Sequence, residues 1–134
     1  MKVFFSIFII FTTILILDVV WLKFIIWDFF YSQIKHLSKI KNGNFDINLY
    51  YWLIVWIIMS LWIYIFVFQN DKNILSLFLY WALFGFVLYS VFDFTNLTFI
   101  KDYPLKFALV DIAWWSFLVW ISSVISYKII NYFF

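Results

Sequence analysis

Four long and almost uncharged apolar runs constrain the fold of this chain more than any other feature of its sequence. Each supplies the ~20 mostly apolar residues that a membrane-crossing helix needs, and each is too continuous for a strand of a membrane barrel. Lipid offers the backbone no hydrogen-bond partners, so the runs should be helices. The predicted spans are about 3–22, 47–68, 74–94 and 105–127. The sequence therefore predicts an all-α, integral membrane, four-helix transmembrane bundle, with residues 1–134 as a single transmembrane domain.

The composition agrees with a membrane protein. Hydrophobic residues make up 68% of the chain and aromatic residues 28%. Charged residues make up 12%, about half of the roughly 25% that is usual in soluble domains. A soluble fold of this size would leave a large apolar surface exposed. The net charge of +2 does not favour nucleic acid as a partner, and a chain without cysteine has no disulfides or thiolate metal sites.

The first run superficially resembles a signal peptide, because Lys2 precedes a long apolar stretch. A small-residue cleavage site does not follow it; Asp18 and Trp21 do. We therefore expect this segment to be retained as a membrane helix.

The connections between the spans differ in length. Residues 69–73 should form a tight polar turn, and residues 98–104 a short loop that ends at Pro104, a residue suited to the start of a helix. The first connection is longer. Its apolar residues recur at helical spacing while its lysines fall off that stripe, so we expect a short interfacial helix after the first span, ending at Asn42-Gly43. The stripe consists of Trp27, Phe30, Tyr31, Ile34 and Leu37.

Lysines set the expected orientation. The side that holds the first and third connections carries six lysines, and the other side carries three. The positive-inside rule then puts these two connections in the cytoplasm and both termini outside. Several aromatic residues near the span ends fit interfacial belts or plain lipid-facing bulk, among them Tyr50, Tyr51, Trp52, Tyr103 and Tyr127.

Three of the seven acids, Asp18, Asp93 and Asp111, lie within predicted spans, and the other four lie in loops or at interfaces. An acid inside the membrane costs about 2.5–3.5 kcal/mol even on insertion scales. Asp18 and Asp111 each lie five residues from a boundary lysine, which is roughly 7 Å along a helix. Asp93 lies eight residues before Lys101. The three acids should therefore share one level, near the expected cytoplasmic side.

Their helix faces agree as well. Tyr89, Asp93 and Asn96 form one stripe with Gly85, which would let another helix approach closely. The segments "DVVW" at 18–21 and "DIAW" at 111–114 each put an aspartate and a tryptophan on one face, and an indole N–H is a donor for a carboxylate. The predicted polar site is Asp18, Trp21, Tyr89, Asp93, Thr95, Asn96, Asp111 and Trp114, with Tyr31, His36 and Asn48 as peripheral candidates.

Such a site has a structural and a functional interpretation. Polar residues can hold membrane helices together through hydrogen bonds worth about 0.6–2 kcal/mol each. Alternatively, carboxylates crowded at low dielectric cannot all carry charge, so the site could hold a proton, a cation or a cationic headgroup. We expect no metal or cofactor, because no DxD or HxxxD spacing is present. His36 lies among lysines and is expected to be a solvated interfacial residue rather than a base.

An enzyme is not favoured. There is no Ser-His-Asp arrangement and no glycine-rich phosphate loop, since the chain has two glycines. Catalysis would have to use acid–base chemistry of the aspartates.

Several segments together resemble a known family. They are "LDVVW", a following "FFY" with "HL", "NLYYW", "GFVLYSVFDFTNLTFIKDYP" and "LVDIAWW". Over nearly the whole chain they are similar to the small four-helix bacterial membrane proteins catalogued as domain-of-unknown-function family 2177. Phe92 and Trp115 depart from the pattern, where Tyr and Gly are common. On this resemblance the signature residues are Asp18, Trp21, Tyr31, Gly85, Tyr89, Asp93, Thr95, Asn96, Pro104, Asp111 and Trp114.

The resemblance implies a bacterial inner membrane protein and genes for lipid modification as neighbours. The leading hypothesis is therefore a role in membrane-lipid modification or headgroup binding, with membrane lipids as partners. The first alternative is a small proton- or cation-coupled transporter, acting as a homo-oligomer, although a transporter site should lie near the midplane. The second is a structural subunit that binds another membrane protein.

Overall fold

The computed structural model describes residues 2–68 and 74–133, and the turn expected at 69–73 lies outside the described residues. The chain is 83% helical. Four helices, over residues 2–25, 49–66, 79–99 and 105–133, are long and apolar enough to cross a membrane. The prediction of an all-α membrane bundle is confirmed.

The order of elements follows the predicted spans. Helix α1 (Lys2–Val20) continues into the π-helical segment η1 (Trp21–Ile25), and α2 (Trp27–Ile34) follows after a bend at Ile26. The strands β1 (Ile40–Lys41) and β2 (Asn44–Phe45) precede α3 (Leu49–Ile63), which continues into the π-helical segment η2 (Tyr64–Phe68). The last two elements are α4 (Ile74–Phe99) and α5 (Leu105–Phe133). They run five and six residues past the predicted ends of their spans.

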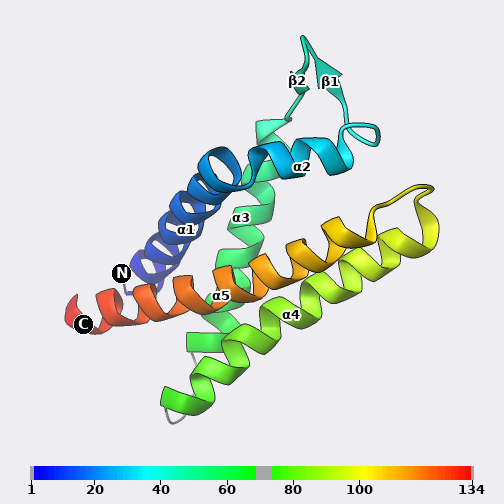
Figure 1. The fold of residues 1–134 in the computed structure, drawn as a ribbon. Coiled ribbons are helices and arrows are strands. Elements are labelled where there is room, and N and C mark those ends of the chain that lie inside the picture. Colours follow the sequence, from blue (N-terminus) through cyan, green and yellow to red (C-terminus); the bar gives the residue numbers. More distant parts are fainter. Residues whose placement is uncertain (1, 69–73, 134) are drawn as a thin grey trace.

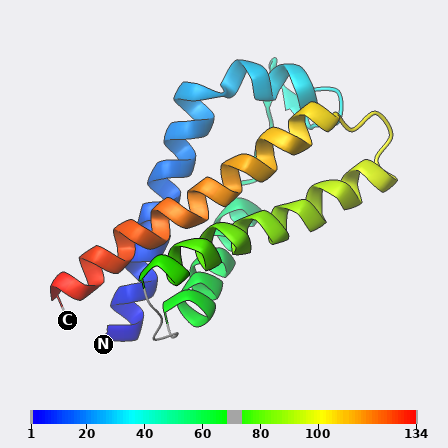
Figure 2. The same ribbon diagram turned by 60° about the horizontal axis from the view of Figure 1, so that its bottom comes forward.

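Helix α5 lies at the centre of the bundle. It packs along its length against α4, and α1 packs against it on another side while also contacting α3 (Figures 1 and 2). Its serines Ser122, Ser123 and Ser126 are buried, and small side chains allow close helix approach. Both chain termini lie at the end of the bundle away from α2 and the β hairpin (Figure 1).

Gly85 makes the contact between α4 and α5 close. A Cβ atom at this position would lie 2.5 Å from the backbone oxygen of Trp115 and 2.9 Å from the Cα of Ser116. Only a residue without a side chain fits there, so the expectation that Gly85 lets another helix approach is confirmed.

The first connection contains a feature that the sequence interpretation missed. Asn42 and Gly43 both have positive φ, 50° and 76°, which suits the turn of a two-residue hairpin. Antiparallel pairing joins Ile40 to Phe45 and Lys41 to Asn44. The hairpin extends beyond α2 (Figure 1), where the sequence predicted only a break after a helix.

Helix α2 connects to the start of α5. The Phe30 ring meets Phe107 edge-on at 4.9 Å between centroids, and the Lys106 ammonium lies 5.6 Å from the centroid of Phe29. His36 lies 3.1 Å, through Nε2, from the backbone oxygen of Asp102 in the loop between α4 and α5. The first and third connections therefore meet at one end of the bundle.

Candidate functional site

Asp18 is buried where three helices meet. Its side chain is 1% exposed. Trp114 on α5 donates its indole N–H to Oδ1 at 3.2 Å, and Trp56 on α3 donates to Oδ2, also at 3.2 Å. Trp21 stacks on Trp114 with centroids 4.1 Å apart and planes 5° apart. Both carboxylate oxygens thus have a donor, and we name Asp18, Trp56 and Trp114 the Asp18 clamp.

Asp93 on α4 is in a different situation. Its side chain is fully buried. Tyr103, in the loop after α4, donates its hydroxyl to Oδ1 at 2.7 Å, and Asn96 donates to the same Tyr103 hydroxyl at 3.4 Å. Oδ2 is buried and has no hydrogen-bond partner among the residues that the structure describes. We name Asp93, Asn96 and Tyr103 the Asp93 arm, which leaves one buried acceptor atom unsatisfied.

The phenol of Tyr103 is a suitable donor for this arm. Burial, and next its hydrogen bond to the Asp93 carboxylate, raise the pKa of Tyr103 above its ordinary value of 10.0. The hydroxyl therefore keeps its proton at neutral pH and can donate it to Oδ1.

Asp111 connects the two parts. It lies within electrostatic range of Asp93 and of Asp18, and its carboxyl group has the side chain of Trp115 as a hydrogen-bonding neighbour. Unlike the other two acids it is partly exposed. Tyr89 stacks on Trp115 at 4.2 Å and lies within electrostatic range of all three acids. The three aspartates thus form one electrostatic unit, which we name the acid cluster.

The local sequence of α5 explains why the indoles of Trp114 and Trp115 contact different neighbouring helices. Consecutive residues of an α-helix point about 100° apart. Trp114 therefore reaches Asp18 on α1, while Trp115 reaches Tyr89 on α4. Asp111 lies one turn before both tryptophans, between the two neighbouring helices.

Among the residues that the structure describes, the side-chain donors to Asp18 and Asp93 are indole and phenol groups. Lys23 and Lys106, five residues from Asp18 and Asp111 along the chain, have their ammonium groups over Phe24 and Phe29 instead. No three acid or histidine side chains within residues 2–68 and 74–133 converge as metal ligands do.

Other predicted site residues make different contacts. Trp21 contacts the donor Trp114 rather than donating to Asp18. Thr95 is exposed on α4, two residues from Asp93. Tyr31 donates its hydroxyl to the backbone oxygen of Gly43 at 2.8 Å and so holds the hairpin. His36 is exposed and contacts the α4–α5 loop, as described above.

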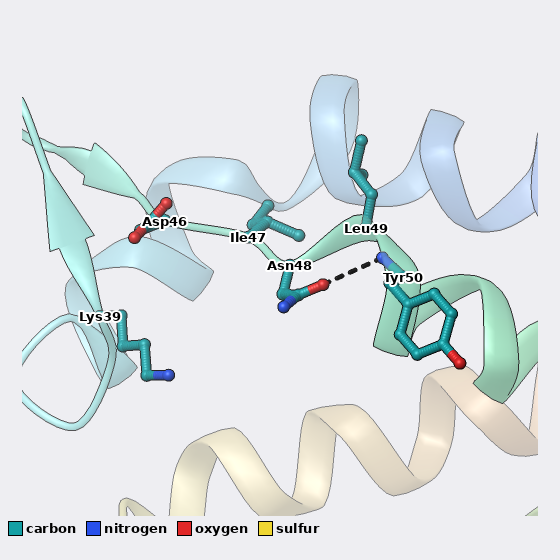
Figure 3. A pocket seen from close by; sticks show the side chains of 6 residues that line it. All are labelled: Lys39, Asp46, Ile47, Asn48, Leu49 and Tyr50. Atoms are coloured by element: carbon teal, nitrogen blue, oxygen red, sulfur yellow. Dashed lines mark hydrogen bonds between the residues drawn. The ribbon is translucent and has the colours of Figure 1, made fainter.

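Asn48 does not join the acid cluster. It is the N-cap of α3, where its side chain accepts a hydrogen bond from the backbone N–H of Tyr50 at 3.1 Å. It also lines a surface pocket of about 480 Å³ between the base of the hairpin and the first turn of α3 (Figure 3). The pocket is lined by Lys39, Asp46, Ile47, Asn48, Leu49 and Tyr50.

Three contributors to the site were not predicted as such. Trp56 is one of several aromatic residues in the second apolar run, and no local pattern distinguishes it. Tyr103 was interpreted as an interfacial aromatic, although it belongs to the "DYP" segment that follows Asp93 and Asn96. Trp115 was noted only as a departure from a family pattern.

Comparisons with known proteins add one finding. A family model described as "Predicted membrane protein (DUF2177)" matches residues 3–128. Neither a curated protein nor a solved structure matches the chain.

Proposed function

The chain belongs to the DUF2177 family of predicted membrane proteins, and from that premise we propose that it takes part in membrane-lipid modification by binding a lipid headgroup at the acid cluster. The protein is an integral, multi-pass membrane protein. In this proposal it resides in a bacterial inner membrane with the acid cluster toward the cytoplasmic leaflet.

One observation carries the proposal. Oδ2 of Asp93 is buried without a hydrogen-bond partner in the described part of the chain, next to a second acid that is partly exposed. A buried acceptor without a hydrogen bond costs about 1–3 kcal/mol of stability. If Asp93 had only a structural role, we would expect a protein donor to bond to Oδ2. A bound group with N–H or O–H donors would satisfy Oδ2 and interact with Asp111.

The depth of the cluster favours a headgroup. Asp93 lies six residues before the end of α4 and Asp111 six residues after the start of α5, which is about 9 Å from the helix ends. The hydrocarbon core is about 30 Å thick, so the acids lie off-centre, on one side of the midplane near which the sites of transporters lie.

The surface around this end also suits lipid. Phe24 is 72% exposed, Ile25 65% and Leu49 63%, and all three flank the helix ends on the side of the acid cluster. Six lysines lie in the first and third connections or within the adjoining helix ends, and juxtamembrane lysines attract anionic cytoplasmic leaflets. A lipid could thus approach the cluster within the membrane surface.

Comparative lipidomics tests the proposal. The strains to compare are the parent, the deletion, and the deletion complemented with the wild type, with Asp93→Asn, or with Asp28→Asn. Asp28 is an exposed acid on α2 at the same end of the bundle, so its variant is a matched control. We expect one lipid class to change in the deletion and in the Asp93→Asn strain, and to be restored by the wild type and by Asp28→Asn at equal protein abundance.

An unchanged lipidome in the deletion strain would refute the proposal. Proton and cation flux into liposomes that contain the purified protein would then test the transporter alternative. A lipidome that Asp93→Asn restores as well as the wild type does would show that lipid modification does not use this site.

A further inference from the structure

Within the part of the chain that the structure describes, the acid cluster receives hydrogen bonds from neutral side chains. The two indoles of the Asp18 clamp and the hydroxyl of Tyr103 all donate to carboxylate oxygens. An ionised carboxylate only accepts, so this pattern of donors suits the charged form. The lysines nearest in sequence, Lys23 and Lys106, lie over phenylalanine rings. Within residues 2–68 and 74–133, the protein therefore satisfies part of the hydrogen-bonding capacity of the cluster with neutral donors. A cationic ligand would add a positive charge beside the acids.

Aromatic rings lie beside the acids. Tyr89 and Trp115 stack with planes 9° apart next to Asp111, and Trp21 and Trp114 stack next to Asp18. Tyr89 and Trp21 are only partly buried. Rings of this kind attract cations over their faces, and a combination of rings and carboxylates is suited to ammonium groups.

We propose that the headgroup bound by the acid cluster carries an ammonium group, which reaches Oδ2 of Asp93 and the carboxylate of Asp111. This inference rests on the function proposed above and narrows its ligand class. An ammonium group supplies the N–H donor that Oδ2 lacks among the described residues, and it adds a positive charge beside the acids. A hydroxyl headgroup supplies only the donor, and an anionic headgroup is repelled by the acids.

The test compares phosphatidylethanolamine with a lipid that differs from it at the amine alone and with an anionic lipid. Purified wild-type protein is titrated with phosphatidylethanolamine, with its N-acetylated form, and with phosphatidylglycerol of the same acyl chains, and the bound lipid is measured by native mass spectrometry. N-acetylation keeps the phosphate and the chains and removes the positive charge. Free ethanolamine is a fourth probe. This comparison needs no substitution in the protein.

Three variants then locate the binding. Asp93→Asn and Asp111→Asn each remove one of the two acids, and both leave the Asp18 clamp unchanged. Asp28→Asn is the control. We expect phosphatidylethanolamine to bind wild type and Asp28→Asn roughly ten- to hundred-fold more tightly than the N-acetylated lipid, the range that one charge-assisted hydrogen bond provides. The preference should disappear in Asp93→Asn and in Asp111→Asn, whose folding is checked by thermal melting.

The outcomes separate this inference from the function on which it rests. If all three lipids bind alike and all weaken in the two aspartate variants, the lipid site stands and the ammonium inference is wrong. If the binding of free ethanolamine depends on Asp93 and Asp111 and the binding of the lipids does not, the site binds ammonium groups and the proposed lipid function is wrong. If no probe depends on Asp93 or Asp111, both are wrong.

Discussion

The Asp18 clamp and the Asp93 arm contain the same acid at nearly the same depth, but their hydrogen bonding differs. Asp18 receives one indole donor on each oxygen and joins α1, α3 and α5. Of the residues that the structure describes, one donates to Asp93, from the loop that follows its own helix, and the other carboxylate oxygen has no partner among them. A carboxylate that joins helices and has a donor on each oxygen is typical of a structural role. A carboxylate with one oxygen unsatisfied, next to an accessible acid, is typical of a binding site.

The largest expected effect is on stability, and it tests the structural role of the Asp18 clamp. Asp18→Ala leaves the indole N–H groups of Trp56 and Trp114 buried without an acceptor, so it should destabilise the fold by about 2–4 kcal/mol. Asp93→Ala removes an acid that has one donor and should cost clearly less. Unfolding in mixed detergent micelles, followed by tryptophan fluorescence, measures both. Equal destabilisation by the two substitutions would contradict the comparison.

The second-largest effect is expected from a change in the packing of α4, the helix that contains Asp93, against α5. Gly85→Ala introduces a Cβ against the backbone oxygen of Trp115 and should cost about 1–3 kcal/mol through overpacking. It should separate Asp93 from Asp111 and weaken lipid binding, while the Asp18 clamp, two of whose three members lie on α1 and α3, remains. Thermal melting and the lipid titration measure the two effects. Val87→Ala, at an exposed position of α4, should change neither, and a Gly85→Ala protein with normal binding would argue against a site shared between α4 and α5.

A smaller effect comes from the donor of the Asp93 arm. Tyr103→Phe removes the only hydroxyl donor to Oδ1 that the structure describes and should cost about 1 kcal/mol at neutral pH. Because the pKa of Tyr103 is raised in the folded protein, its contribution is fully present below the unfolded pKa of about 10. It should be lost as the pH rises above that value.

The stability difference between wild type and Tyr103→Phe, measured at pH 8 and at pH 11, checks this pH dependence. The difference should shrink at the higher pH. A difference that grows with pH would show that the phenol does not donate to Asp93 in the folded state.

The smallest effect is expected at His36. Its contact with the backbone oxygen of Asp102 is exposed, so His36→Ala should change the free energy of unfolding by less than about 0.5 kcal/mol. Lipid binding should also stay within error of the wild type. A loss of binding in His36→Ala would extend the site beyond the acid cluster and toward α2.

The sequence predicted the helices and the level of the acids for a simple physical reason. Apolar runs of membrane-spanning length form helices, and helical rise converts residue spacing into depth. The stripe of Gly85, Tyr89 and Asp93 likewise follows from helical periodicity. These are local properties of the chain, and local properties can be derived from a sequence.

The donors could not be predicted in the same way. Trp56 is 38 residues from Asp18 and its partnership depends on how α3 crosses α1, which hydropathy does not specify. Asn48 has the depth expected of a cluster member, but its position before Leu49 makes it a helix cap. The two-residue strands of the hairpin are too short to show an alternating pattern, and their turn residues were interpreted only as a break.

The position of Asp18 has a consequence for biosynthesis. Its donor Trp114 lies 96 residues later in the chain, so at about 5–20 residues per second the ribosome needs several seconds more to produce it. During that interval α1 must enter the membrane with an acid whose partners do not yet exist. The first span is also the most apolar of the four. Its high hydropathy offsets the free-energy cost of inserting Asp18 into the membrane before α3 and α5 are synthesised.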